Sequence, residues 1–133
     1  MRTAVLDVDT SGVPVVDITD RAEGFVRGGG DGLLSVFAPH ATAGVALMET
    51  QSGSEADLVD ALERLLPRDG RYRHRHGSPG HGADHLLPAL VSPSLTIPVA
   101  AGRLLLGTWQ RVVLVSLNTD NPRRRVRLSL LSG

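Results

Sequence analysis

Cysteine and lysine are both absent from this chain of 133 residues. Without cysteine the protein can form no disulfide, no thiolate nucleophile and no sulfur-ligated zinc site, so any metal would need nitrogen or oxygen ligands. Because all 14 cationic side chains are arginine, lysine Schiff-base chemistry and a Walker-type phosphate lysine are excluded as well. Arginine remains available for bidentate contacts with phosphate or carboxylate groups.

Aromatic residues, excess positive charge and long apolar runs are also scarce. The formal net charge is zero and the chain holds 1 Trp, 1 Tyr and 2 Phe, which argues against nucleic-acid binding. Apolar runs such as 104–106 and 112–115 fall far short of the roughly 20 residues that span a bilayer, so we expect no membrane insertion. Asp7 interrupts the apolar segment that a signal peptide would need, and we therefore expect a cytoplasmic protein.

The hydrophobic pattern predicts one α+β domain over residues 1–133. Alternation predicts strands at 3–8 and 13–18 joined by a hairpin-like turn, and neighbouring strands at 33–38 and 44–49. Helical spacing predicts a short helix capped by Asp20 and a long helix capped by Ser54. We expect a surface loop at 68–84, a helical turn at 85–90, and strands at 94–100, 104–107, 111–117 and 124–131. The predicted fold is a compact, mainly antiparallel β-sheet domain with one long helix and one or two short ones.

Histidine is concentrated in one segment, because four of the five histidines lie between residues 74 and 85. Imidazole is a common metal ligand and the side chain best suited to proton transfer near neutral pH, which indicates a metal or acid/base site. A solvated, basic surface loop explains the same segment equally well. The spacing of His81 and His85 would place both on one face of a helix, but Pro79, Gly80 and Gly82 argue against a helix that begins so early.

Outside this segment, His40 and Glu49 are further polar candidates. His40 follows Pro39 at the end of a predicted strand, where a histidine is more often structural than a ligand. Glu49 ends an apolar strand, so we expect its carboxylate to be partly desolvated and to need a partner.

The second half of the chain adds Trp109, Gln110 and Arg124. Core packing is the favoured interpretation of Trp109, and the Gln110 amide can both donate and accept hydrogen bonds. Strand alternation points Arg124 inward, opposite to its neighbours Arg123 and Arg125. A buried arginine needs an anionic partner, which makes Arg124 the better candidate for binding phosphate or carboxylate.

Taken in order, six segments carry a resemblance to a known family: His40-Ala41-Thr42-Ala43 with Glu49, Tyr72-Arg73-His74, Asp84-His85-Leu86, Ser94 to Val99, Leu106 to Gln110, and Arg123 to Val126. They resemble the YjbQ-type family, often called the secondary thiamine-phosphate synthase family, from about residue 16 to residue 133. The resemblance implies a compact α+β fold and a homotrimer with sites near the subunit boundaries. It also implies a weak ability to join a pyrimidine pyrophosphate to a thiazole phosphate.

Matching positions assign roles to individual residues. The resemblance implies catalytic roles for His40, Glu49 and His85, and a divalent metal, zinc or similar, at His40, His74 and His85. It implies that Trp109, Gln110 and Arg124 bind a small phosphorylated molecule. His76 and His81 match no family position and are assigned to solvent.

This chain departs from the family pattern at three places. Ala41 replaces a common threonine, Met48 a common asparagine and Ser116 a common acidic residue. The lost carboxylate at Ser116 weakens both a metal site and a general base. Three hypotheses stay open: a thiamine-phosphate synthase-like transferase; a histidine-based metal or small-anion binding trimer with another role, such as hydrolysis; and a non-catalytic assembly module. None of them involves nucleic acid or a membrane.

Overall fold

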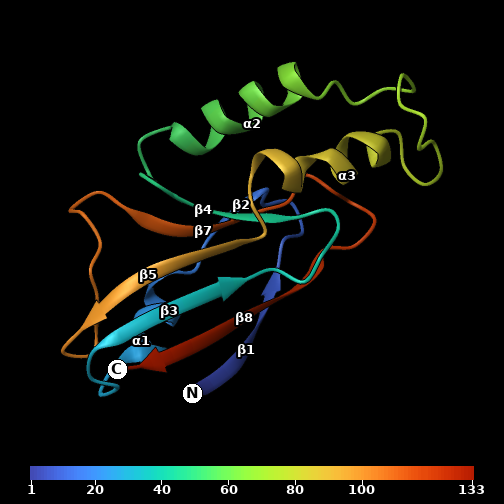
Figure 1. Ribbon diagram of the computed structural model, residues 1–133. Helices are drawn as coiled ribbons and strands as arrows, with labels where there is room; N and C mark the ends of the chain where they lie inside the picture. The colour runs from blue at the N-terminus through green and yellow to red at the C-terminus, as the bar shows by residue number, and fades with distance from the viewer.

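Two antiparallel sheets and three helices make up the protein (Figure 1). The computed structural model describes all residues, 1–133. One sheet has five strands in the order β1-β8-β3-β5-β6, and the other has three in the order β2-β7-β4. The elements are β1 (Arg2–Asp9), β2 (Val15–Asp17), α1 (Thr19–Val26), β3 (Gly32–Phe37), β4 (Gly44–Met48), α2 (Ser54–Leu65), α3 (His81–Leu90), β5 (Ser94–Ala100), β6 (Arg103–Leu104), β7 (Arg111–Val115) and β8 (Arg123–Ser132). This confirms the predicted α+β class with one long and two shorter helices.

The three-stranded sheet is the middle layer of the molecule, with α2 and α3 on one face and the five-stranded sheet on the other (Figure 1). Successive residues of β7 point alternately to the two faces of the three-stranded sheet. Val112 and Leu114 belong to the core shared with the five-stranded sheet, whereas Val113 and Val115 pack in the cluster of Leu62 and Leu87 from the helices. A strand that is buried on both faces reads as a continuous apolar run, which is the pattern of residues 112–115.

Two predicted strand pairings are wrong. The strands on either side of Gly12 do not form a hairpin, because β1 pairs with β8 and β2 pairs with β7 in the other sheet. In the same way β3 pairs with β5 and β8, while β4 pairs with β7. Alternation identifies which face of a strand is buried, but it carries no information about which strand lies alongside.

The predicted helix caps are displaced by one or more residues. Helix α1 begins at Thr19, where the Asp17 carboxylate accepts hydrogen bonds from the Thr19 N–H at 2.9 Å and from its hydroxyl at 2.6 Å. Helix α2 begins at Ser54 itself, after Gly53 with φ +89°. None of the helices combines the length and the apolar composition needed to cross a bilayer.

Candidate metal centre

Helix α3 and the segment before it position the histidines. The helix begins at His81, four residues earlier than the predicted turn, and His81 N–H donates to the Ser78 carbonyl at 3.0 Å. Gly82, which argued against an early helix, permits it: a Cβ there would lie 2.6 Å from the His74 carbonyl oxygen and 2.7 Å from Tyr72 Cβ. The first turn of α3 therefore packs directly against the backbone of the segment that carries His74.

Three histidines converge at this contact: His74, His81 and His85 each offer one ring nitrogen, and these atoms lie within 4.8 Å of one another. The Nε2 atoms of His81 and His85, one helical turn apart, are 3.1 Å from each other. The rings of His74 and His81 are stacked, with centroids 4.8 Å apart and planes inclined by 14°. His81 and His85 are half-buried and His74 is exposed, so the cluster opens to the surface.

The membership of this cluster corrects the predicted metal set. His81 had been assigned to solvent and belongs to the cluster, because α3 begins early enough to place it one turn before His85. His40 is not part of it. His76 is exposed, yet its ring centroid lies 4.2 Å from that of His74 and 4.5 Å from that of His81.

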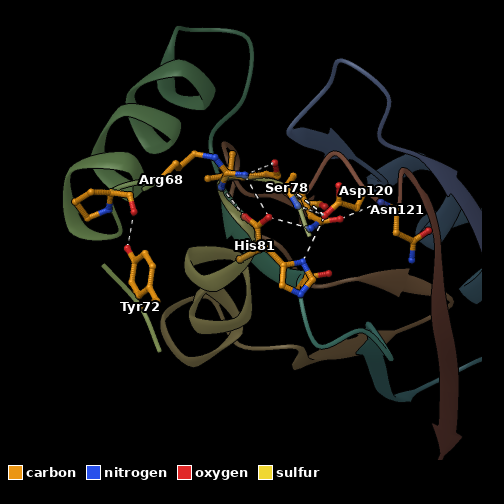
Figure 2. A network of polar contacts seen from close by, with 12 residues as sticks. Arg68, Tyr72, Ser78, His81, Asp120 and Asn121 are labelled. Atoms are coloured by element: carbon orange, nitrogen blue, oxygen red, sulfur yellow. Dashed lines mark hydrogen bonds and ion pairs between the residues drawn. The ribbon is translucent and has the colours of Figure 1, made fainter. Parts of the chain in front are cut away.

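A buried carboxylate next to the two helix histidines anchors α3. Asp84 is 1% exposed and forms a bidentate ion pair with Arg68, which also donates to the Leu117 carbonyl. The Asn118 amide donates to the same carboxylate at 2.9 Å, and Asn118 in turn accepts from the Asn121 N–H. Figure 2 shows how these contacts tie α3 to the segment after α2 and to the loop after β7. Helix α3 is therefore anchored at Asp84, beside the half-buried His81 and His85.

The electrostatics of the cluster favour neutral imidazoles. Desolvation and the neighbouring histidines lower the pKa of His74 and of His85 below the ordinary value of 6.5. Neutral imidazole is the form that binds a metal ion. At neutral pH both rings are thus available as ligands.

His40 and Arg124 lie together in a second polar region. His40 Nε2 accepts a hydrogen bond from the Arg125 N–H at 2.9 Å, so its ring is anchored to β8. Arg124 points inward as predicted and is 2% exposed. Its Nη2 donates to Thr42 Oγ1 at 2.8 Å and to Ser116 Oγ at 2.9 Å, while Nε has no partner. Hydroxyl groups, not a carboxylate, therefore surround this buried cation.

Glu49, Trp109 and Gln110 do not join the histidines. Glu49 is exposed and accepts from the Ser52 hydroxyl at 2.9 Å, so the predicted desolvation is wrong. Trp109 is 73% exposed, which overturns the expectation of core packing, and Gln110 Oε1 accepts from the Gly107 N–H and closes the turn. The turn lies before β7, whereas Asn118, which contacts Asp84 in the histidine helix, lies after it. Strand β7 spans about 17 Å at roughly 3.3 Å per residue and keeps the turn away from the histidines.

Comparison with known proteins shows to which family the chain is related. The family model described as "UPF0047 protein YjbQ-like" matches residues 4–133. The chain belongs to this family. A UPF0047 protein from Mycobacterium tuberculosis is 65% identical over the full length of both chains, and UPF0047 protein YugU from Bacillus subtilis is 30% identical over 84% of this chain and 83% of its own.

Solved structures agree with the family assignment. The crystal structure of a hypothetical protein from Aeropyrum pernix superposes with a TM-score of 0.90 at 33% identity, covering both chains completely. A conserved hypothetical protein from Thermus thermophilus gives 0.84 at 33% identity, covering 96% of this chain and 99% of that one. The predicted YjbQ-like identity and fold are confirmed.

The residues that sequence reasoning missed are those that anchor α3 and His81 beside the histidine cluster. Asp84 appeared only as part of a matching segment, and Arg68, Asn118 and Asp120 drew no attention. The one available signal for His81 was its spacing of four residues from His85, and the glycines around it masked that signal.

Proposed function

We propose that this YjbQ-like protein binds a divalent metal ion, zinc or similar, at His74, His81 and His85, and acts through it on a small phosphorylated molecule. The observation that carries the proposal is the convergence of three imidazole nitrogens within 4.8 Å. Nitrogens bound to one tetrahedral ion at 2.0–2.1 Å lie about 3.4 Å apart. His81 and His85 already meet this distance, and the exposed His74 needs a shift of only about 1.5 Å.

Three protein ligands leave a coordination position for water or substrate, as in catalytic zinc sites. A metal ion there would supply Lewis-acid polarisation of a phosphoryl oxygen or activation of a water molecule for hydrolysis. A cavity of about 280 Å³ adjoins the cluster and is lined by His74 and Arg75, among others. Arg75 is exposed and donates through Nε to the Tyr72 carbonyl, which leaves the rest of its guanidinium free for an anionic substrate.

Metal binding is tested by titrating the purified, metal-free protein with zinc and with cobalt. We expect stoichiometric binding by the wild type and a large loss of affinity in His74→Ala, His81→Ala and His85→Ala. His40→Ala is the matched control, because His40 contacts β8 instead of the cluster, and it should bind as the wild type does. Metal-dependent hydrolysis of a simple phosphate ester, abolished by chelator and by His85→Ala, tests the catalytic half of the proposal.

The thiamine-phosphate synthase activity implied by the family resemblance is a second candidate. Its support in the structure is Arg124, a buried guanidinium with an unpartnered Nε and no carboxylate in contact. Such a group suits a phosphate or pyrophosphate substrate. Growth of a thiamine-requiring strain that carries this protein, lost in Arg124→Gln, would support the activity, whereas growth without loss would argue against Arg124 as the binding residue.

We further propose that the protein is a homotrimer. The outer face of the five-stranded sheet has no helix over it and exposes Leu33, Phe37 and Leu131, with Leu33 directly opposite Leu131 in the register. Exposed apolar side chains gathered on one face are typical of subunit contacts. Light scattering of the wild type should give three times the mass of one chain, and Leu33→Glu should lower that mass.

A further inference from the structure

The Nδ1 side of His81 carries a contact that the other histidines of the cluster lack. Asp120 Oδ2 lies 3.4 Å from His81 Nδ1, as Figure 2 shows. The same oxygen accepts from the Ser78 hydroxyl at 2.9 Å and from the Ser78 N–H at 3.3 Å. Neither His74 nor His85 has a carboxylate within hydrogen-bonding distance. Asp120 is thus the one acidic group that touches the cluster.

This contact determines which nitrogen of His81 can bind a metal. A carboxylate beside Nδ1 favours the proton on Nδ1, and the lone pair is then left on Nε2. Nε2 is the atom that faces His85 Nε2 at 3.1 Å. Metal-ligating histidines commonly donate their second N–H to a carboxylate, which fixes the ring and raises its basicity.

The backbone around the pair is built closely against it. Gly77 has φ +81°, and a Cβ there would lie 2.8 Å from His81 Nδ1 and 3.2 Å from Asp120 Oδ2. Ser78, the next residue, binds the carboxylate through both its N–H and its hydroxyl. Residues 77 and 78 therefore cover the contact on one side and hold the carboxylate in place.

We infer that Asp120 is a positioning residue for the metal site, which sets the tautomer and the direction of His81 without binding the ion itself. This role rests on the proposed function, because it presupposes a metal at His74, His81 and His85. Asp120 lies in the loop between β7 and β8, whereas His81 opens α3, so the contact joins the ligand helix to the sheet. Nothing in the order of residues along the chain connects the two.

The experiment compares Asp120→Asn with the wild type and with Asp9→Asn. Asp9 is a matched control because its carboxylate also accepts a nearby serine N–H, that of Ser11, but contacts no histidine. Cobalt and zinc affinities are measured by titration, and the ¹⁵N shifts of the imidazoles report the tautomer of His81 in the metal-free protein. Thermal unfolding of the metal-free variants checks that each is folded.

For Asp120→Asn we expect metal affinity to fall by roughly 10-fold to 100-fold, the usual cost of losing an outer partner of a ligand. We also expect the His81 proton to leave Nδ1 in part, an altered cobalt spectrum, and partial recovery in Asp120→Glu. Asp9→Asn should match the wild type in every measurement. If the wild type binds no metal, the proposed function fails and this role with it. If the wild type binds and Asp120→Asn binds equally well with an unchanged tautomer, only the role of Asp120 is overturned.

Discussion

Helix α3 carries two adjacent polar surfaces that differ in exposure and in hydrogen-bond partners. On one, His81 and His85 are half-buried and open to an added ligand, and desolvation lowers the pKa of His85. On the other, Asp84 is fully enclosed and its carboxylate is satisfied by Arg68 and Asn118. His81 and Asp84 are three residues apart, so the two surfaces adjoin on the same side of the helix. A site that must hold ligands in fixed directions can use such a pairing, because a rigid network beside the histidines keeps their part of the helix in place.

The largest effect on stability is expected from loss of the buried Asp84 carboxylate. Removal of the carboxylate in Asp84→Ala leaves a partly buried guanidinium and the Asn118 amide without their acceptor. We expect the free energy of unfolding to fall by about 3 kcal/mol, which urea denaturation of the metal-free protein can measure. Asp69→Ala removes a solvent-exposed Asp–Arg pair, with Arg71, and should leave the midpoint of urea denaturation unchanged. Equal effects of the two substitutions would contradict the contrast.

The next largest effect is expected from zinc binding at the histidine cluster. Zinc present at about 100 times its dissociation constant should raise the free energy of unfolding by about 2.7 kcal/mol, because only the folded state assembles the three ligands. The gain should disappear in His85→Ala and after addition of a chelator, as followed by thermal unfolding. Stabilisation by zinc that persists in His85→Ala would place the ion elsewhere.

The sequence predicted the histidine cluster better than it predicted the contacts of Asp84. The four histidines between residues 74 and 85 indicated a site, although His81 was assigned to solvent, and the motifs pointed to the correct family and fold class. Strand ranges followed from alternation, and the long helix from its apolar spacing. These features depend on residues near one another along the chain, which a single sequence displays directly.

The contacts that hold α3 and His81 in place join segments that are distant in the sequence. Arg68 meets Asp84 across the end of α2, and Asp120 meets His81 from the loop after β7. His40 and Gln110 were drawn into the predicted site by resemblance, but the fold uses them to bind the Arg125 and Gly107 N–H groups. Gly80 and Gly82 were interpreted as evidence against an early helix, although the close packing around α3 requires them.

A third, smaller effect concerns His40, which lies outside the histidine cluster and is bound to β8. Burial and the charge of Arg124 lower the pKa of His40 below 6.5, so the folded state prefers the neutral ring. The stability that this provides is complete above pH 6.5 and is lost as the pH falls below it. We expect His40→Gln to flatten the decline in unfolding free energy between about pH 7 and about pH 5, as followed by urea denaturation. A decline as steep as that of the wild type would mean that His40 is not the titrating group.

The smallest effect is expected for His76, the histidine that touches the cluster without belonging to it. Its ring contacts those of His74 and His81, yet it is exposed and no carboxylate orients it. Substitution in His76→Ala should change zinc affinity by much less than the roughly 10-fold to 100-fold cost of losing an outer partner of a ligand. Titration alongside His81→Ala makes the test direct. A loss as large as that in His81→Ala would make His76 a fourth ligand, and the site would then be closed and structural, without a position for substrate.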